Sequence, residues 1–141
     1  QERATEVAAR RDEWIRSLEQ LICTLRSWLQ EAVNQKLLKV EQVGHDLREE
    51  DLGDYQAPGL RIRTIDGRAV EVVPRGRNVV AMGTGDMLFR SHGRVDITNG
   101  ARKFMLYRLE GENWVIMDED VYSERVFDRP YFEAALQSLL E

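Results

Sequence analysis

One long stripe of apolar residues runs through the N-terminal third of the chain. Its members recur at spacings of three and four, the pattern of a single amphipathic α-helix with a broad buried face. Only one arginine interrupts it. The stripe consists of Ala8, Arg11, Trp14, Leu18, Leu21, Leu25, Trp28 and Ala32, with Ile15, Ile22 and Leu29 in a row beside it.

A helix of about 30 residues is roughly 45 Å long, which exceeds one face of a small domain. We therefore expect part of the stripe to pack on the chain's own sheet and part to need a second surface. The same spacing occurs in helix pairs, and large aromatic residues are enriched at interface centres. The predicted association face consists of Trp14, Leu18, Leu21, Leu25 and Trp28.

After the helix, the segment 36–52 fits either a continued helical face or a strand. Gly53, Pro58 and Gly59 then mark a change from a period of 3.6 to a period of 2. The strands that follow are joined by short turns, which predicts an antiparallel meander rather than alternating strand and helix. We divide the chain into the helix, residues 1–38, and the meander with a C-terminal helix, residues 39–141, within a single domain.

The first hairpin whose register can be predicted lies around Gly67. A three-residue loop, residues 65–67, with Gly67 in the left-handed conformation, keeps Ile62 and Val70 on matching faces. It also places Arg61 opposite Glu71, an attractive cross-strand pair.

A second hairpin is predicted at the dipeptide Asn99-Gly100, a sequence typical of a two-residue type I′ turn. This turn would align Val95 with Phe104 and would pair Asp96 with Lys103.

The fold class that we predict is α+β. A long N-terminal helix covers a meander of about six or seven strands, which forms a curved sheet or a small barrel. The segment 103–109 is apolar on both faces and is expected to be a central strand. A short helix that begins near Asp128 and Pro130 ends the chain, with Phe132, Ala135, Leu136, Leu139 and Leu140 on its buried face.

Charge is distributed unevenly along the 141 residues, whose net charge is −5. Residues 1–53 carry −3, residues 54–109 carry +5 and residues 110–141 carry −7. The basic and acidic segments either neutralise each other by packing or leave an anion-binding face. The arginines that would form such a face are Arg75, Arg77, Arg90 and Arg94. An acidic chain with few interleaved aromatic residues makes nucleic acid the less expected anion.

Residues with catalytic or metal-binding chemistry are scattered. Cys23, His45 and His92 stand alone, so no zinc site is predicted, and Asp118 to Asp120 lack the pattern of a calcium loop. Ser91, His92 and Asp86 lack a nucleophile elbow, and the glycines of Gly83-Thr84-Gly85 lack the rest of a phosphate loop. We predict no cofactor, no metal and no catalytic residue.

The function that we expect is a non-catalytic protein-interaction module, a cytoplasmic adaptor or regulatory subunit that associates through its N-terminal helix. The partner would be a second copy or another protein. No apolar run reaches the roughly 20 residues of a membrane span, and the single cysteine fits a reducing compartment. The alternatives are an anion-binding or nucleic-acid-binding meander, and a small hydrolase using His92 or a metal-dependent enzyme using Asp118 and Asp120.

Overall fold

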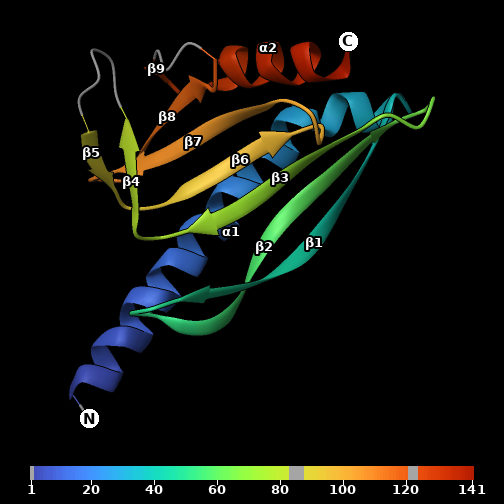
Figure 1. Cartoon of the computed structure of the whole chain (residues 1–141). Helices are drawn as coiled ribbons and strands as arrows, with labels where there is room; N and C mark the ends of the chain where they lie inside the picture. The colour runs from blue at the N-terminus through green and yellow to red at the C-terminus, as the bar shows by residue number, and fades with distance from the viewer. Residues whose placement is uncertain (1, 83–87, 121–123) are drawn as a thin grey trace.

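The computed structural model of the chain describes residues 2–82, 88–120 and 124–141. Two helices pack on a curved antiparallel sheet (Figure 1), which confirms the α+β prediction. The helices are α1 (Glu2–Asn34) and α2 (Arg129–Leu140). The strands are β1 (Leu38–Glu49), β2 (Gly53–Thr64), β3 (Ala69–Gly76), β4 (Val79–Met82), β5 (Leu88–Ser91), β6 (Arg94–Thr98), β7 (Lys103–Leu109), β8 (Asn113–Asp118) and β9 (Glu124–Val126).

Seven of these strands form one sheet in the order β1-β2-β3-β6-β7-β8-β9, and β4 and β5 form a separate hairpin between β3 and β6. The outermost strands of the seven-stranded sheet, β1 and β9, do not pair with each other within the described residues. The sheet is therefore open and curved rather than a barrel. The segment left undecided between helix and strand is β1, which pairs with β2 along its whole length.

The main core lies between the two helices and the inner face of the sheet. α1 contributes Trp14, Leu18 and Leu25, each at most 1% exposed. The sheet contributes alternate residues of its central strands, and α2 contributes Phe132, Ala135, Leu136 and Leu139. Leu140 is only partly buried. The outer face of the sheet carries a second buried cluster of Met105, Tyr107, Val115 and Met117, so β7 is covered on both faces as predicted.

The first hairpin has the predicted register. Arg61 lies opposite Glu71, their side chains form an ion pair at 3.2 Å, and Gly67 has a φ of 89°.

The second hairpin differs from its prediction. Val95 lies opposite Leu106 and Asp96 opposite Met105, because Gly100 and Ala101 are the central residues of the turn. The side chain of Asn99 explains the change, since its Oδ1 accepts hydrogen bonds from the backbone N–H groups of Ala101 and Arg102 at 2.9 and 2.8 Å. Asn99 therefore starts the turn, and Gly100, at a φ of 93°, takes the first central position, where type II′ turns place glycine.

The alternation of buried and exposed side chains along strand β2 shifts by one residue at Pro58–Gly59, so the opposite side of the strand faces the core beyond this point. Leu60 and Ile62 are buried on one side of this point, and Tyr55 and Ala57 on the other. A Cβ atom at residue 59 would lie 2.4 Å from the carbonyl oxygen of Val72, so only glycine fits here. The glycine that we read as punctuation therefore lies inside a strand, and the bend carries Tyr55 to Trp14 of α1, whose Nε1 donates to the Tyr55 hydroxyl at 3.2 Å.

Candidate functional site: an aromatic groove beside a buried ion-pair cluster

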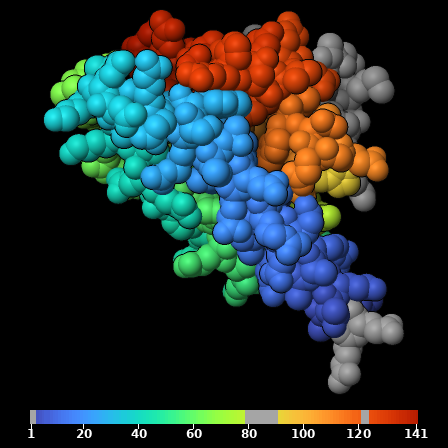
Figure 2. Space-filling model, turned by 180° about the vertical axis from the view of Figure 1, so that it is seen from behind, coloured from blue at the N-terminus to red at the C-terminus, as the bar shows by residue number. Residues whose placement is uncertain are grey.

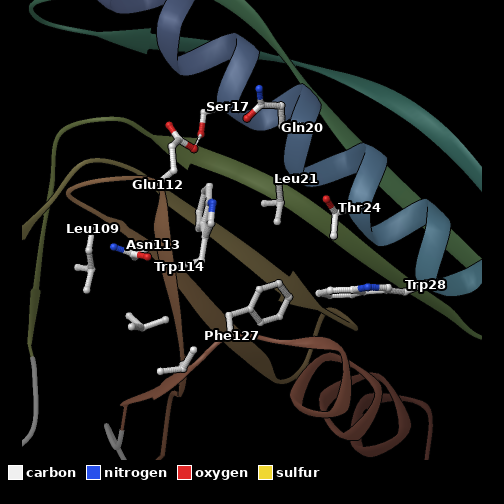
Figure 3. Close-up of a pocket in the computed structure, with 12 residues that line it drawn as sticks. Ser17, Gln20, Leu21, Thr24, Trp28, Leu109, Glu112, Asn113, Trp114 and Phe127 are labelled. Carbon is white, nitrogen blue, oxygen red and sulfur yellow. Dashed lines mark hydrogen bonds between the residues drawn. The ribbon is translucent and has the colours of Figure 1, made fainter.

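A groove of about 520 Å³ lies between α1 and the edge of the sheet at β8 and β9. Leu21 and Thr24 extend towards it from α1, and Trp114 and Phe127 extend from the opposite wall (Figure 3). The outer side of α1 forms the surface of the face shown in Figure 2, bordered by α2 and by β7 and β8. The groove is lined by Ser17, Gln20, Leu21, Thr24, Trp28, Leu109, Glu112, Asn113, Trp114, Val115, Val126 and Phe127.

Aromatic rings form one end of the groove. The ring centroids of Trp28 and Phe127 are 5.7 Å apart, and both rings rest on Phe132 of α2, which is fully buried. The backbone N–H of Phe127 donates to the carbonyl oxygen of Trp114 at 3.0 Å, which fixes these two residues of the sheet wall to each other. Val126, 72% exposed, lies beside Phe127 on the edge strand. One exposed and two partly buried apolar side chains therefore line this end of the groove above the buried ring of Phe132.

Glu112 is the one ionisable residue among those that line the groove. Its backbone has a φ of 63°, an uncommon conformation for a residue other than glycine. Two contacts hold its carboxylate, since Oε2 accepts from the hydroxyl of Ser17 at 2.7 Å and Oε1 accepts from Arg108 at 2.9 Å. The carboxylate is thereby fixed at the opposite end of the groove from the aromatic rings.

Arg108 lies directly behind Glu112, and its side chain is only 4% exposed. It makes two hydrogen bonds to Glu13 of α1, at 2.6 and 3.1 Å, and its Nε donates to the carbonyl oxygen of His92 at 2.9 Å. The guanidinium also lies over the ring of Trp14, 4.9 Å from its centroid. Arg108 holds the pKa of Glu13 below its usual range, so this carboxylate is charged at neutral pH. The cluster fixes α1 to β7 and to the β7–β8 turn.

On the other side of Trp14, the Tyr55 hydroxyl donates to Glu49. Glu49 in turn accepts the backbone N–H groups of Arg77 and Asn78 at 3.0–3.1 Å. Burial and the neighbouring carboxylate raise the pKa of Tyr55, so its hydroxyl stays protonated as a donor. The contacts around Trp14 are therefore structural, and they set the position of the helix against the sheet.

The five residues of the predicted association face occupy different places. Trp14, Leu18, Leu21 and Leu25 are at most 6% exposed, because the sheet and α2 of the same chain cover them. In this structure they are not available to a second chain. Trp28 is partly buried and lines the groove, where Leu21 also reaches the wall.

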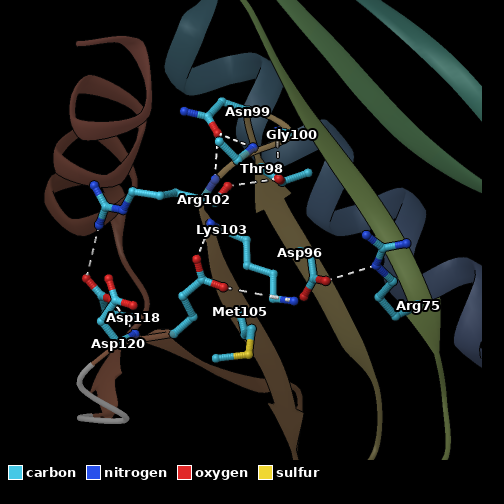
Figure 4. A network of polar contacts seen from close by, with 12 residues as sticks. Arg75, Asp96, Thr98, Asn99, Gly100, Arg102, Lys103, Met105, Asp118 and Asp120 are labelled. Atoms are coloured by element: carbon cyan, nitrogen blue, oxygen red, sulfur yellow. Dashed lines mark hydrogen bonds and ion pairs between the residues drawn. The ribbon is translucent and has the colours of Figure 1, made fainter.

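The predicted anion-binding arginines do not converge on an open site. Arg75 binds Asp96 at 2.9 Å (Figure 4). Arg94 binds the same carboxylate at 2.9 Å, and Asp96 is 1% exposed. The place between the two guanidinium groups is thus taken by the chain's own acid. Arg77 lies apart, donating to the side chain of Asn78, and the side chain of Arg90 lies outside the described part of the structure.

The residues considered for catalysis have structural contacts instead. The backbone N–H of His92 donates to the carbonyl oxygen of Arg108, and the carbonyl oxygen of His92 accepts from Nε of Arg108. Asp118 accepts the backbone N–H of Asp120 and faces Arg102 at 3.5 Å. Ser91 is buried, Cys23 is exposed on α1, and Asp86 and the glycines at 83 and 85 lie outside the described residues. Among the described residues, no group of three His, Cys, Asp or Glu side chains is arranged to hold a metal ion. Within the same residues, no helix has both the length and the apolarity that crossing a membrane requires.

The pH dependence of stability should report on His45. Its Nε2 is buried without a hydrogen-bond partner, and the imidazole lies against Gly59. Burial lowers the pKa of His45, and the positive charges of Arg75 and Arg61 lower it further. Glu71 has the opposite effect, which is smaller than that of burial. The unfolded chain therefore binds a proton at His45 more readily than the folded protein does. The free energy of unfolding should be at its full value above about pH 6.5 and should decrease as the pH falls below it.

The measurement is urea denaturation of the wild type and of His45→Gln between pH 7 and pH 5. The wild type should lose stability over this interval by up to about 1.4 kcal/mol per pH unit more than the variant does, the limit for one proton. Parallel pH profiles for the two proteins would show that His45 titrates alike in the folded and unfolded states.

The apolar stripe in the sequence singles out Leu21 and Trp28 of the groove but none of the residues on its sheet side, for a definable reason. Trp114, Phe127 and Glu112 are far from α1 in sequence, and none belongs to a motif. One signal was present, because Arg108 interrupts the apolar segment 103–109 on the face that turns inward. Comparisons of the chain with protein-family models, with curated proteins and with solved structures give no match.

Proposed function

We propose that the chain is a non-catalytic protein-interaction module and that its docking site is the groove between α1 and the β8–β9 edge. The single observation that carries this proposal is that one open groove is lined by three partly buried aromatic side chains, Trp28, Trp114 and Phe127, and by the exposed side chain of Val126. Clustered exposed apolar and aromatic side chains rimmed by polar residues mark interaction sites, and aromatic residues contribute most where they anchor a partner. We therefore propose that association uses the side of α1 that carries Gln20, Thr24 and Trp28, in place of the predicted face of Trp14, Leu18, Leu21, Leu25 and Trp28.

Site-specific photocrosslinking tests this proposal. A small aliphatic diazirine side chain, of about the length of glutamine and able to crosslink on illumination, is placed at Gln20, which lines the groove, and is compared with the same group at Gln30, which is exposed on α1 but does not line it. We expect a discrete adduct with a polypeptide from residue 20 only. Thr24→Trp, which fills the groove from its exposed rim, should abolish the adduct.

Equal labelling at both positions, or an adduct that persists in Thr24→Trp, would contradict the proposal. Light scattering after size exclusion shows whether the partner is a second copy of the chain. In that case the wild type has a mass near twice 16.4 kDa, and Gln20→Trp has the mass of a single chain.

A further inference from the structure

In the described part of the chain, the walls of the groove contain no lysine and no arginine. Of the twelve lining residues seven are apolar, four are neutral and polar, and one is an acid, Glu112. In a chain with 20 basic residues, this composition leaves the groove without a group that would attract a carboxylate.

The segment that forms the sheet side of the groove is acidic. Residues 110–141 carry nine acidic side chains and two arginines. Glu110 precedes Glu112 in the β7–β8 turn, and Glu124 and Asp128 flank Val126 and Phe127. Of the two arginines, Arg129 is paired with Glu133 at 3.4 Å, and Arg125 donates to the carbonyl oxygen of Glu124 at 3.0 Å. The net charge of this segment is therefore negative.

α1 shows the same pattern along the groove. Gln20 and Thr24 line its middle, and the positions seven residues away on the same side of the helix are Glu13 and Glu31. Both ends of this row are therefore acidic. Glu13 is paired with Arg108, whereas Glu31 is exposed near the aromatic end, one turn beyond Trp28.

We propose that the segment docking in the groove is a cationic apolar peptide of a protein partner, an inference that rests on the proposed function. An apolar side chain of the partner fills the space between Trp28, Phe127 and Trp114. Lysine or arginine side chains flanking this anchor face Glu112 and the acidic rim, and aromatic faces favour cations over anions. Complementary charge of this kind accelerates association and rejects acidic segments.

The groove-lining residues of α1, from Ser17 to Trp28, span about 16 Å, which matches about 11 residues of a helical peptide or about five of an extended one. The probe is therefore a display library of random peptides of about 11 residues, long enough for either conformation, selected for binding to the intact chain. Each selected peptide is retested on Gln20→Trp and on the matched variant Gln30→Trp. A peptide counts as groove-dependent when the first substitution removes its binding and the second does not.

We expect groove-dependent peptides to carry an excess of lysine and arginine around an apolar anchor. Replacing the basic residues of the tightest one by glutamine should weaken its binding about tenfold or more, and added salt should reduce this difference. Gln20→Lys should weaken the parent peptide by a similar factor, and Gln30→Lys should not.

Three results would overturn the inference, and they separate it from the proposed function. Groove-dependent peptides that are neutral or acidic leave the docking site in place and remove its preference for cations. A groove occupied by a second copy of the chain, shown by the mass change in Gln20→Trp, does the same. If no selected peptide depends on the groove, while peptides are selected elsewhere on the chain, the docking site itself is wrong.

Discussion

Replacing Gly93 by alanine should cost the fold about 3 kcal/mol, the upper end for overpacking a core. A Cβ atom at this position would lie 2.1 Å from Cζ3 and 2.3 Å from Cη2 of Trp14. The indole cannot give way easily. It is fully buried, its Nε1 is bound to the Tyr55 hydroxyl, and Arg108 and Trp114 pack on it at 4.9 and 6.3 Å between centres.

Urea denaturation of Gly93→Ala measures this cost, and the near-ultraviolet circular dichroism of the tryptophans reports the displaced ring. Gly44→Ala is the matched control, because a Cβ atom there meets only the side chain of Gln56, at 3.8 Å, and its cost should stay within about 0.5 kcal/mol. In a Trp14→Leu background the alanine at residue 93 should cost less, and the cost that remains is the backbone strain at its φ of 156°. An unchanged cost in that background would show that contact with Trp14 is not the reason for the glycine.

Local patterns in the sequence predict what depends on neighbouring residues. The apolar stripe predicts α1, alternation predicts the strands, and the turn around Gly67 predicts the pairing of Arg61 with Glu71. The turn after Thr98 shows the limit of such reasoning. There the side chain of Asn99 also donates to the carbonyl oxygen of Leu139 at 3.0 Å, a contact with α2 that no dipeptide preference contains.

Periodicity shows that one face of a helix is apolar, but it does not show what covers that face. The stripe predicts an association face of Trp14, Leu18, Leu21, Leu25 and Trp28, whereas the curvature of the sheet brings the chain's own strands over Trp14, Leu18 and Leu25. Curvature follows from positions such as Gly59 and from the two-sided packing of β7, which depend on distant contacts. The groove could not be predicted for the same reason, since its two walls are separated by more than 80 residues between Trp28 and Leu109.

The fixed position of Glu112 connects the core to the proposed docking site. Arg108 is buried between this carboxylate and Glu13, so the same ion-pair cluster holds α1 on the sheet and orients the acidic wall of the groove. A partner that contacts Glu112 would therefore bind a surface whose geometry is set in the core. The cluster should consequently show strong coupling between its members.

We expect Glu13→Gln and Glu112→Gln to cost about 1 kcal/mol each and the double variant to cost about 3 kcal/mol or more. Either single substitution leaves Arg108 one carboxylate, and the altered side chains, 43% and 48% exposed in the wild type, reach water. The double substitution leaves a guanidinium that is 4% exposed without a counter-charge, which is the costly state for a buried ion. Urea denaturation of the four proteins gives the coupling free energy directly.

Adding Arg108→Met to the double variant should recover part of the lost stability, because a side chain of similar length without charge removes the unpaired ion. Glu133→Gln is the control for an exposed pair. It breaks the contact with Arg129, whose side chain is 48% exposed, and should change stability by less than about 0.5 kcal/mol. If the two glutamine substitutions are additive, and methionine at residue 108 recovers nothing, then water or a rearranged side chain satisfies Arg108. The cluster would then fix neither α1 nor the acidic wall of the groove.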